Sequence, residues 1–295
     1  MSGCAAATVP GNGPGAAAPG WRRAWVVWVA AGLWGLLVWL WVPVLRDWAP
    51  LPWPERPFPS PDGDRSYYLV QPEGIGPGER LPLVFVLQGF DTVEGSSQST
   101  KDLYRAFAAR VADRRFIAVF PRGWPGAFPE VPEVRAWYPG HLLENRAFLA
   151  SLAAHLAATL PADPRRVVLA GFSNGGYFGG IEALTNPDTP FTAFWFDGGA
   201  WPYGRHPAAP RRPIFLSWGE QDLYNRPNTE AFRGYLAANG WAEGADLRTF
   251  RHGGAHVFAR GALDEALTFL LTDHDGAGPG RPDPAGGGKG KEDGP

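Results

Sequence analysis

Residues 167–176 read VVLAGFSNGG, and this stretch decides how the chain folds. Its first four residues predict a short buried strand, and residues 174–184 are compatible with a helix. Ser173 therefore stands on a sharp turn between a strand and a helix. Gly171 and Gly175 lack the side chains that would clash where the chain passes close to this serine. The arrangement indicates an exposed serine nucleophile, and an inert serine in a tight turn is the alternative.

An acid and a histidine follow Ser173 in the order that a nucleophile of this kind requires. Asp222 comes after a short apolar run at residues 213–218, and His256 comes after a second run at residues 247–250. Side chains that directly follow parallel strands gather at one edge of the sheet. We therefore predict that Ser173, Asp222 and His256 form a catalytic triad.

Two residues compete for places in this triad. Asp197 also follows a predicted strand, at residues 191–196, and is an alternative acid. His252 precedes His256 in the same loop and is an alternative base. The other histidines have no metal-ligand spacing to a cluster of Cys, Asp or Glu, so we predict no metal site.

Short apolar runs alternate with helical patterns between residues 65 and 271. Continuous apolar runs of this length indicate strands that are buried on both faces. The alternation predicts the α/β class, with a mostly parallel central sheet flanked by helices. The expected strands lie at residues 66–71, 83–87, 116–120, 167–170, 191–196, 214–218 and 247–250, and the expected helices at residues 101–114, 144–160, 174–184, 229–238 and 261–271.

The composition bears on possible partners. The chain has 295 residues and a formal net charge of −2, which gives no electrostatic reason to expect nucleic acid as a partner. Lysine occurs only at positions 101, 289 and 291, so the chain has no lysine-rich patch. The single cysteine, Cys4, has no partner for an internal disulfide, and the fold must therefore be stabilised by its core.

The N-terminal region predicts a membrane anchor. Residues 24–45 carry no charge and would form a helix about 33 Å long, enough to span a hydrocarbon core of about 30 Å. Arg22-Arg23 before this run places the N-terminus inside and the following domain outside the cytoplasm. A cleavable signal peptide, which would give a secreted protein, is the alternative. The expected parts are a disordered cytoplasmic tail (1–23), a transmembrane signal-anchor helix (24–45), a proline-rich linker (46–64), a catalytic domain (65–272) and a disordered C-terminal tail (273–295).

Four stretches resemble the α/β-hydrolase fold and, within it, the polyhydroxybutyrate depolymerase and feruloyl esterase group. They read LPLVFVLQGF (81–90), RRVVLAGFSNGG (165–176), WGEQD (218–222) and GGAH (253–256). The resemblance implies an esterase in which Ser173 is the nucleophile, His256 the general base and Asp222 its orienting partner. It further implies that the N–H groups of Phe90 and Asn174 form the oxyanion hole and that no cofactor is required.

The sequence departs from this group at three points. Gln88 stands where the group usually has a histidine, the cysteines of the group are absent, and its members are usually secreted freely. Main-chain oxyanion donors do not need the histidine side chain, and Gln88 can still hydrogen-bond the loop. Some hydrolases of this fold carry an acid where Asp197 stands, so Asp197 stays open as an alternative to Asp222.

Residues 121–141 form a long predicted loop that contains Trp124, Trp137 and Tyr138. These rings either pack the loop onto the domain or form an apolar wall for an acyl or aryl group, and in the second case they bind substrate. The sequence as a whole predicts an anchored serine hydrolase that acts on a small-molecule or polymeric ester. A serine peptidase of the same fold and a catalytically silent binding protein at the membrane surface are the alternatives.

Overall fold

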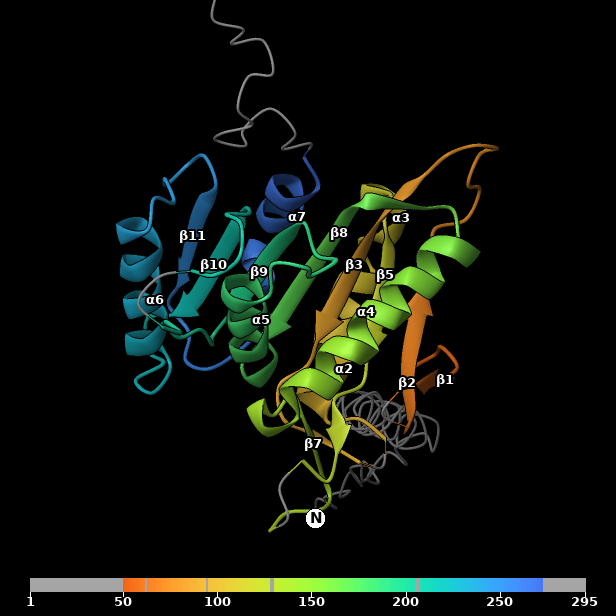
Figure 1. Cartoon of the computed structure of the whole chain (residues 1–295), viewed down its shortest axis with the longest axis horizontal. Coiled ribbons are helices and arrows are strands. Elements are labelled where there is room, and N and C mark those ends of the chain that lie inside the picture. The colour runs from red at the N-terminus through yellow and green to blue at the C-terminus, as the bar shows by residue number, and fades with distance from the viewer. Residues whose placement is uncertain (1–49, 62, 94, 128–129, 205–206, 273–295) are drawn as a thin grey trace, which may run out of the picture. The chain divides into compact units, whose positions relative to one another are not determined.

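The structure, a computed structural model, describes residues 50–272 except positions 62, 94, 128–129 and 205–206 (Figure 1). The expected spanning helix at 24–45 and the two expected tails, at 1–23 and 273–295, lie outside the described residues. Within the part of the chain that the structure describes, no helix is both long enough and apolar enough to cross a membrane.

A single eight-stranded sheet forms the centre of the described domain. Its strands are β1 (Arg56–Ser60), β2 (Gly63–Val70), β3 (Leu81–Leu87), β5 (Ile117–Pro121), β8 (Ala162–Phe172), β9 (Ala193–Asp197), β10 (Ile214–Gly219) and β11 (Leu247–His252). They lie side by side in the order β1-β2-β5-β3-β8-β9-β10-β11 (Figure 1). Only β2 runs antiparallel to its neighbours β1 and β5, and every other pair is parallel. The predicted α/β class with a mostly parallel sheet is confirmed.

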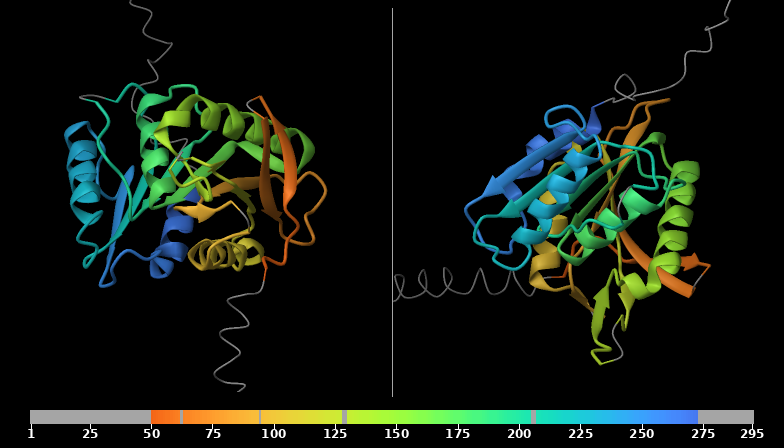
Figure 2. Two further views of the ribbon diagram at one scale, coloured as in Figure 1. Left: turned by 90° about the horizontal axis from the view of Figure 1, so that it is seen from below. Right: turned by 60° about the vertical axis from the view of Figure 1, so that its left-hand side comes forward.

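Helices cover both faces of this sheet (Figure 2). One face is covered by α4 (Leu142–Thr159), α5 (Asn174–Thr185) and α6 (Arg226–Ala238), and the other by α2 (Gln98–Ala108), α3 (Val111–Arg114) and α7 (Leu263–Leu271). Alternate residues of a strand point to opposite faces, so β3 serves both cores. Leu83 and Phe85 pack beneath the first group of helices, whereas Val84 and Val86 pack beneath the second.

The prediction of a proline-rich linker at residues 46–64 is partly wrong, because β1 lies inside this segment. β1 pairs antiparallel with β2, and Phe58 is buried in the core against Phe148. Proline is tolerated at Pro57 and Pro59 because β1 is the edge strand of the sheet, where missing N–H donors cost least. The folded domain therefore begins before residue 56, and Trp53 already stacks on Phe120.

A small second sheet was not predicted. It is formed by β4 (Asp91–Thr92), β7 (Val134–Ala136) and β6 (Trp124–Pro125), which lie in that order. β4 follows the end of β3 and β6 follows the end of β5, so this sheet stands at the edge where the parallel strands end (Figure 1). It shapes the loop at residues 121–141. The predicted helix at 101–114 is likewise two helices, α2 and α3.

Candidate active site

Ser173 sits between the end of β8 and the start of α5 with strained backbone angles, φ 53° and ψ −117°. Positive φ is disfavoured for residues with a side chain and persists only where the surroundings fix it. A Cβ on Gly171 would collide with the carbonyl of Gly175, and one on Gly175 would lie 2.6 Å from the backbone carbonyl oxygen of Gln88. The tight turn predicted from the two glycines is present.

His256 joins Ser173 to Asp222. Its Nε2 lies 2.8 Å from Ser173 Oγ, and its Nδ1 lies 2.6 Å from Asp222 Oδ2. Because a carboxylate only accepts hydrogen bonds, Nδ1 carries the ring hydrogen and Nε2 is left to accept the hydrogen of the serine. The Phe172 ring stacks on the imidazole at a centroid distance of 5.0 Å and holds it in place from one side. The three residues predicted from their order along the chain therefore meet in space.

Asp222 is buried at the end of β10 but is well supplied with donors. Its Oδ1 accepts the backbone N–H of Asn225 at 2.9 Å and that of Tyr224 at 3.3 Å. Burial on its own would raise the pKa of Asp222, but the hydrogen bonds from Asn225 and His256 outweigh burial and lower it below its usual range. The carboxyl group is thus held as the anion that an imidazole base requires.

The two competing residues have other partners. Asp197 accepts hydrogen bonds from Ser217 Oγ at 2.6 Å and from the backbone N–H of Ala259 at 2.8 Å. Its complete burial raises its pKa to about 7. His252 Nδ1 accepts the N–H of Gly254 at 3.2 Å, and burial lowers the pKa of this ring. The geometry therefore favours Asp222 as the acid and His256 as the base.

The expected oxyanion donors flank Ser173. A Cβ on Gly89 would lie only 3.2 Å from the Cβ of Ser173, so the chain that leads into Phe90 passes directly over the serine. Asn174 begins α5, where the first N–H groups of a helix have no partner within the helix. The Asn174 side chain accepts the N–H of Trp137 at 2.6 Å, which ties loop 121–141 to the turn. Both main-chain donors are thus carried by segments that border the serine.

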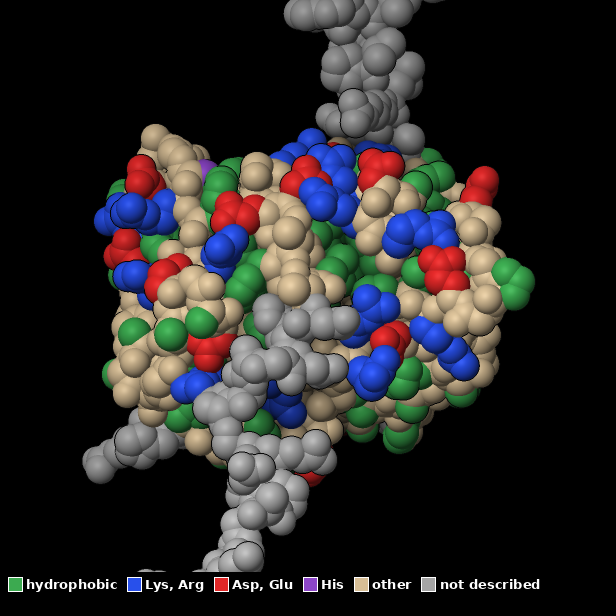
Figure 3. Space-filling view, turned by 90° about the horizontal axis from the view of Figure 1, so that it is seen from above, with side chains coloured by type: hydrophobic (Ala, Val, Ile, Leu, Met, Phe, Trp, Pro, Cys, Tyr) green, Lys and Arg blue, Asp and Glu red, His purple; other side chains and the backbone are tan. Residues whose placement is uncertain are grey.

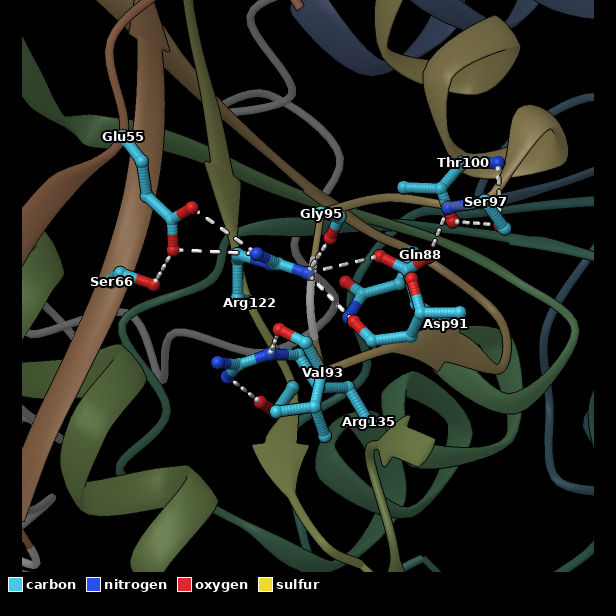
Figure 4. Close-up of polar contacts among 12 residues, drawn as sticks. Glu55, Ser66, Gln88, Asp91, Val93, Gly95, Ser97, Thr100, Arg122 and Arg135 are labelled. Atoms are coloured by element: carbon cyan, nitrogen blue, oxygen red, sulfur yellow. Dashed lines mark hydrogen bonds and ion pairs between the residues drawn. The ribbon is translucent and has the colours of Figure 1, made fainter. Parts of the chain in front are cut away.

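A buried arginine supports the segment that follows Phe90 (Figure 4). Arg122, just after β5, donates to the carbonyl of Thr92 at 2.9 Å and to that of Gly95, and lies 3.6 Å from Asp91. A second carboxylate, Glu55, pairs with it at 3.2 Å. Burying a guanidinium is tolerable only when carboxylates and carbonyls surround it in this way. The arginine thereby fixes the loop beyond the oxyanion segment.

Gln88 fills the position where the resembled group has histidine. Its side chain is completely buried, and Oε1 accepts the hydroxyl of Tyr104 at 3.1 Å and the indole N–H of Trp137 at 3.2 Å. Trp137 belongs to loop 121–141, and Tyr104 to α2. The glutamine therefore links the end of β3 to loop 121–141.

A cleft of about 750 Å³ opens in front of the triad. Six aromatic side chains line it together with polar groups, and three of these rings are prominently exposed at its rim: Phe90, Trp201 and Tyr224. The lining residues are Gly89, Phe90, Ser99, Pro139, Phe172, Ser173, Asn174, Tyr177, Trp201, Tyr203, Tyr224, Asn225, Asn228 and His256. An apolar cleft with a few polar groups suits an acyl or aryl moiety.

The aromatic residues predicted to bind substrate lie elsewhere. Trp137 is completely buried against Phe178, and Trp124 stacks on His141 at 4.4 Å. Tyr138 is partly exposed but is not among the cleft-lining residues. Of loop 121–141, only Pro139 reaches the cleft wall within the described residues. The prediction that this loop supplies the apolar wall is therefore corrected, and the packing interpretation applies to Trp124 and Trp137.

The opposite end of the sheet offers a contrast (Figure 3). Acidic and basic side chains are interspersed on this face. A smaller cavity of about 320 Å³ at the starts of β8 to β10 is lined by arginines, of which Arg166 pairs with Asp163 and Arg211 with Asp246. Its lining residues include no serine and no histidine, unlike those of the cleft at the other end.

Comparisons with known proteins bear on the fold. No protein-family model and no curated protein matches the chain. Solved structures do match: an S-formylglutathione hydrolase from Staphylococcus aureus at 15% identity and TM-score 0.57, over 75% of this chain and 96% of that one. An esterase from Thermogutta terrifontis matches at 17% identity and TM-score 0.53, over 74% and 92%. The feruloyl esterase module of Clostridium thermocellum matches at 14% identity and TM-score 0.54, over 76% and 90%. The chain therefore has the α/β-hydrolase fold.

Proposed function

We propose that this protein is a serine hydrolase that cleaves carboxylic esters with Ser173 as nucleophile. One observation carries the proposal: a continuous line of hydrogen bonds runs from Ser173 Oγ through His256 to Asp222, at 2.8 Å and 2.6 Å, and opens on an aromatic cleft. A serine without such a base is a poor nucleophile at neutral pH. The solved structures of similar fold include proteins named as esterases, which supports the same reaction class.

The reaction follows from the positions of the three side chains. His256 Nε2 takes the hydrogen of Ser173 as Oγ attacks the ester carbonyl, and Asp222 stabilises the imidazolium that forms. The N–H groups of Phe90 and Asn174 donate hydrogen bonds to the negatively charged oxygen of the tetrahedral intermediate. The imidazolium then protonates the leaving alcohol, which leaves an acyl-enzyme. Water, activated by the same histidine, repeats the sequence and frees the acid.

The proposed substrates are short-acyl, aryl or polyester esters, in keeping with the resemblance to polyhydroxybutyrate depolymerases and feruloyl esterases. Exposed rings at the cleft rim, Phe90, Trp201 and Tyr224, would contact a group that extends beyond the scissile bond. The proposed location is a membrane, with residues 24–45 as anchor and the catalytic domain outside the cytoplasm. A high-salt wash should leave the full chain with membranes, whereas a mature protein that begins after residue 45 and is free in the medium would refute the anchor.

Labelling with a fluorophosphonate probe tests the reaction class. Wild-type protein should bind one probe covalently at Ser173, and Ser173→Ala should lose both the label and roughly a millionfold of activity. Ser151→Ala, a change to a partly exposed serine of α4, should retain both. A panel of p-nitrophenyl acetate, methyl ferulate, poly(3-hydroxybutyrate) and a peptide anilide then identifies the bond. Cleavage of the anilide alone would support a peptidase, and absence of labelling in folded protein would support a silent relative.

A further inference from the structure

Asn225 lies between the two partners that complete the triad. Its Nδ2 is 3.3 Å and 3.2 Å from the two oxygens of Asp222 and 3.1 Å from Nδ1 of His256. Its backbone N–H also donates to Asp222, at 2.9 Å. The side chain is buried directly before the first residue of α6, so helix and carboxylate are held by the same residue.

The chemistry of the neighbours determines which end of the Asn225 amide faces the triad. An ionised carboxylate accepts hydrogen bonds and donates none, so the NH₂ group must face Asp222. His256 Nδ1 gives its own hydrogen to Asp222 Oδ2, so it has no lone pair to offer Asn225. Both hydrogens of the amide are therefore directed to the carboxylate, in addition to the backbone donor.

The other end of the amide is held from the cleft wall. Tyr177 donates its hydroxyl hydrogen to Asn225 Oδ1 at 3.0 Å, and Asn228 donates to the Tyr177 oxygen at 2.8 Å. Tyr177 and Asn228 both line the cleft, one from α5 and the other from α6. Reversing the Asn225 amide would set two acceptors, its Oδ1 and the Asp222 carboxylate, against each other. The hydrogen bonds from Asn228 through Tyr177 and Asn225 to Asp222 are therefore satisfied in only one orientation of the Asn225 amide.

On the premise of the proposed triad, we propose that Asn225 is a positioning residue, which keeps the Asp222 carboxylate aimed at His256 and is itself braced by Tyr177 and Asn228. Asn225 acts through Asp222 and does not touch the reacting atoms. Its donors oppose the effect of burial, which on its own would raise the pKa of Asp222. The other titratable groups whose charges couple to Asp222 are His252, Asp197 and Tyr177, and the variants at Asn225 leave all three in place.

Steady-state kinetics of the full chain with p-nitrophenyl acetate test this role. Asn225→Leu should lower kcat roughly 10- to 100-fold with a much smaller change in KM, as expected for the loss of donors to a charged group. Tyr177→Phe should have a smaller effect in the same direction. Tyr235→Phe, the same change at a buried α6 hydroxyl with no hydrogen-bond partner, is the matched control.

A double-mutant cycle with Asp222→Asn separates positioning from general structural damage. If Asn225 acts through the carboxylate, Asn225→Leu should lower kcat little further in the Asp222→Asn background, where the side chain at position 222 is already neutral. Equal losses of kcat in the wild-type and Asp222→Asn backgrounds overturn the proposal. Asn225→Asp is the second variant, for the case that Asn225→Leu does not fold. It keeps the side-chain size and the oxygen that accepts from Tyr177, but it loses the NH₂ donor. A lower kcat in folded Asn225→Asp therefore supports the proposal. Ester hydrolysis by Ser173→Ala would refute the proposed function itself. If Ser173→Ala is inactive but Asn225→Leu is fully active, only the role of Asn225 is refuted.

Discussion

The ends of β9 and β10 carry the same residue type, with pKa values shifted in opposite directions. The strands are parallel neighbours. β9 ends in the buried Asp197, and the buried Asp222 lies in the turn after β10. Burial raises the pKa of Asp197 to about 7, whereas hydrogen bonds lower the pKa of Asp222 in spite of its burial. Two carboxyls at adjacent strand ends are therefore not interchangeable.

The difference comes from the donors that each carboxyl receives. Asp222 accepts two backbone N–H groups, the Asn225 amide and the imidazole of His256. Asp197 accepts one hydroxyl and one backbone N–H, and the charge of Asp222 further disfavours its ionisation. Asp197 also holds the loop that carries His256, through Ala259. A strand-end position predicts where an acid can stand, and only its surroundings decide whether it is an anion or a structural carboxyl.

The largest expected effect separates the two aspartates by activity. Asp222→Asn should reduce kcat roughly 10⁴-fold, because an amide at this position stabilises the wrong tautomer of His256. Asp197→Asn should retain most of the activity, since Asp197 contacts the histidine loop and not the ring. Ester hydrolysis by both variants, normalised to folded protein by circular dichroism, measures the contrast. Near-full activity in Asp222→Asn together with a collapse in Asp197→Asn would reverse the assignment of the acid.

A smaller effect concerns stability against pH. The pKa of Asp197 is about 7 in the folded protein and 3.8 without burial, so the folded state binds a proton that the unfolded state has already released. Its contribution to stability is fully present below about pH 4 and is lost as the pH rises toward 7, at roughly 1 kcal/mol per pH unit. Urea unfolding at pH 5 and pH 8 should show a smaller loss of stability in Asp197→Asn than in wild type. Equal losses in the two proteins would show that Asp197 does not titrate in this range.

The smallest effect concerns the loops that follow the two strands. Trp201 after β9 and Tyr224 after β10 both reach the cleft rim with exposed rings. Trp201→Ala and Tyr224→Ala should each lower kcat/KM for an aryl ester by roughly 1–2 kcal/mol of binding, about tenfold, while the melting temperature stays close to wild type. Leu143→Ala, a change to an exposed apolar residue on α4, is the control. A lower melting temperature with unchanged kcat/KM would assign the two rings to packing.

Local patterns were enough for the parts of the fold that depend on local geometry. The glycines around Ser173 predicted the turn, because a side chain there collides with the backbone in any such strand-to-helix connection. The alternation of apolar runs with helical patterns predicted the α/β class, because a short continuous apolar run indicates a strand that is buried on both faces. β1 escaped prediction because its prolines favour an extended linker, and only pairing with β2 and burial of Phe58 make it a strand.

Aromatic residues show where local patterns end. Loop 121–141 looked like a cleft wall from its composition, yet Trp137 turns inward to Gln88 and Trp124 stacks on His141. The rings that do reach the cleft, such as Trp201 and Tyr224, stand in short loops with no distinguishing pattern. A ring lowers the free energy equally well by packing inward or by lining a cleft, so its direction follows from the neighbours that folding supplies.

The strand–serine–helix turn, the order of Ser173, Asp222 and His256, and the α/β class could all be predicted from the sequence, because each depends on residues close together in the chain or on their order. The tertiary structure decided which aspartate faces His256, that Arg122 and Glu55 brace the loop beyond Phe90, and that Asn225 stands between Asp222 and His256. These contacts join segments far apart in the sequence, and a hydrogen bond holds only within a few tenths of an ångström. Distances of that kind are set by the packing of the whole domain, not by any one stretch of it.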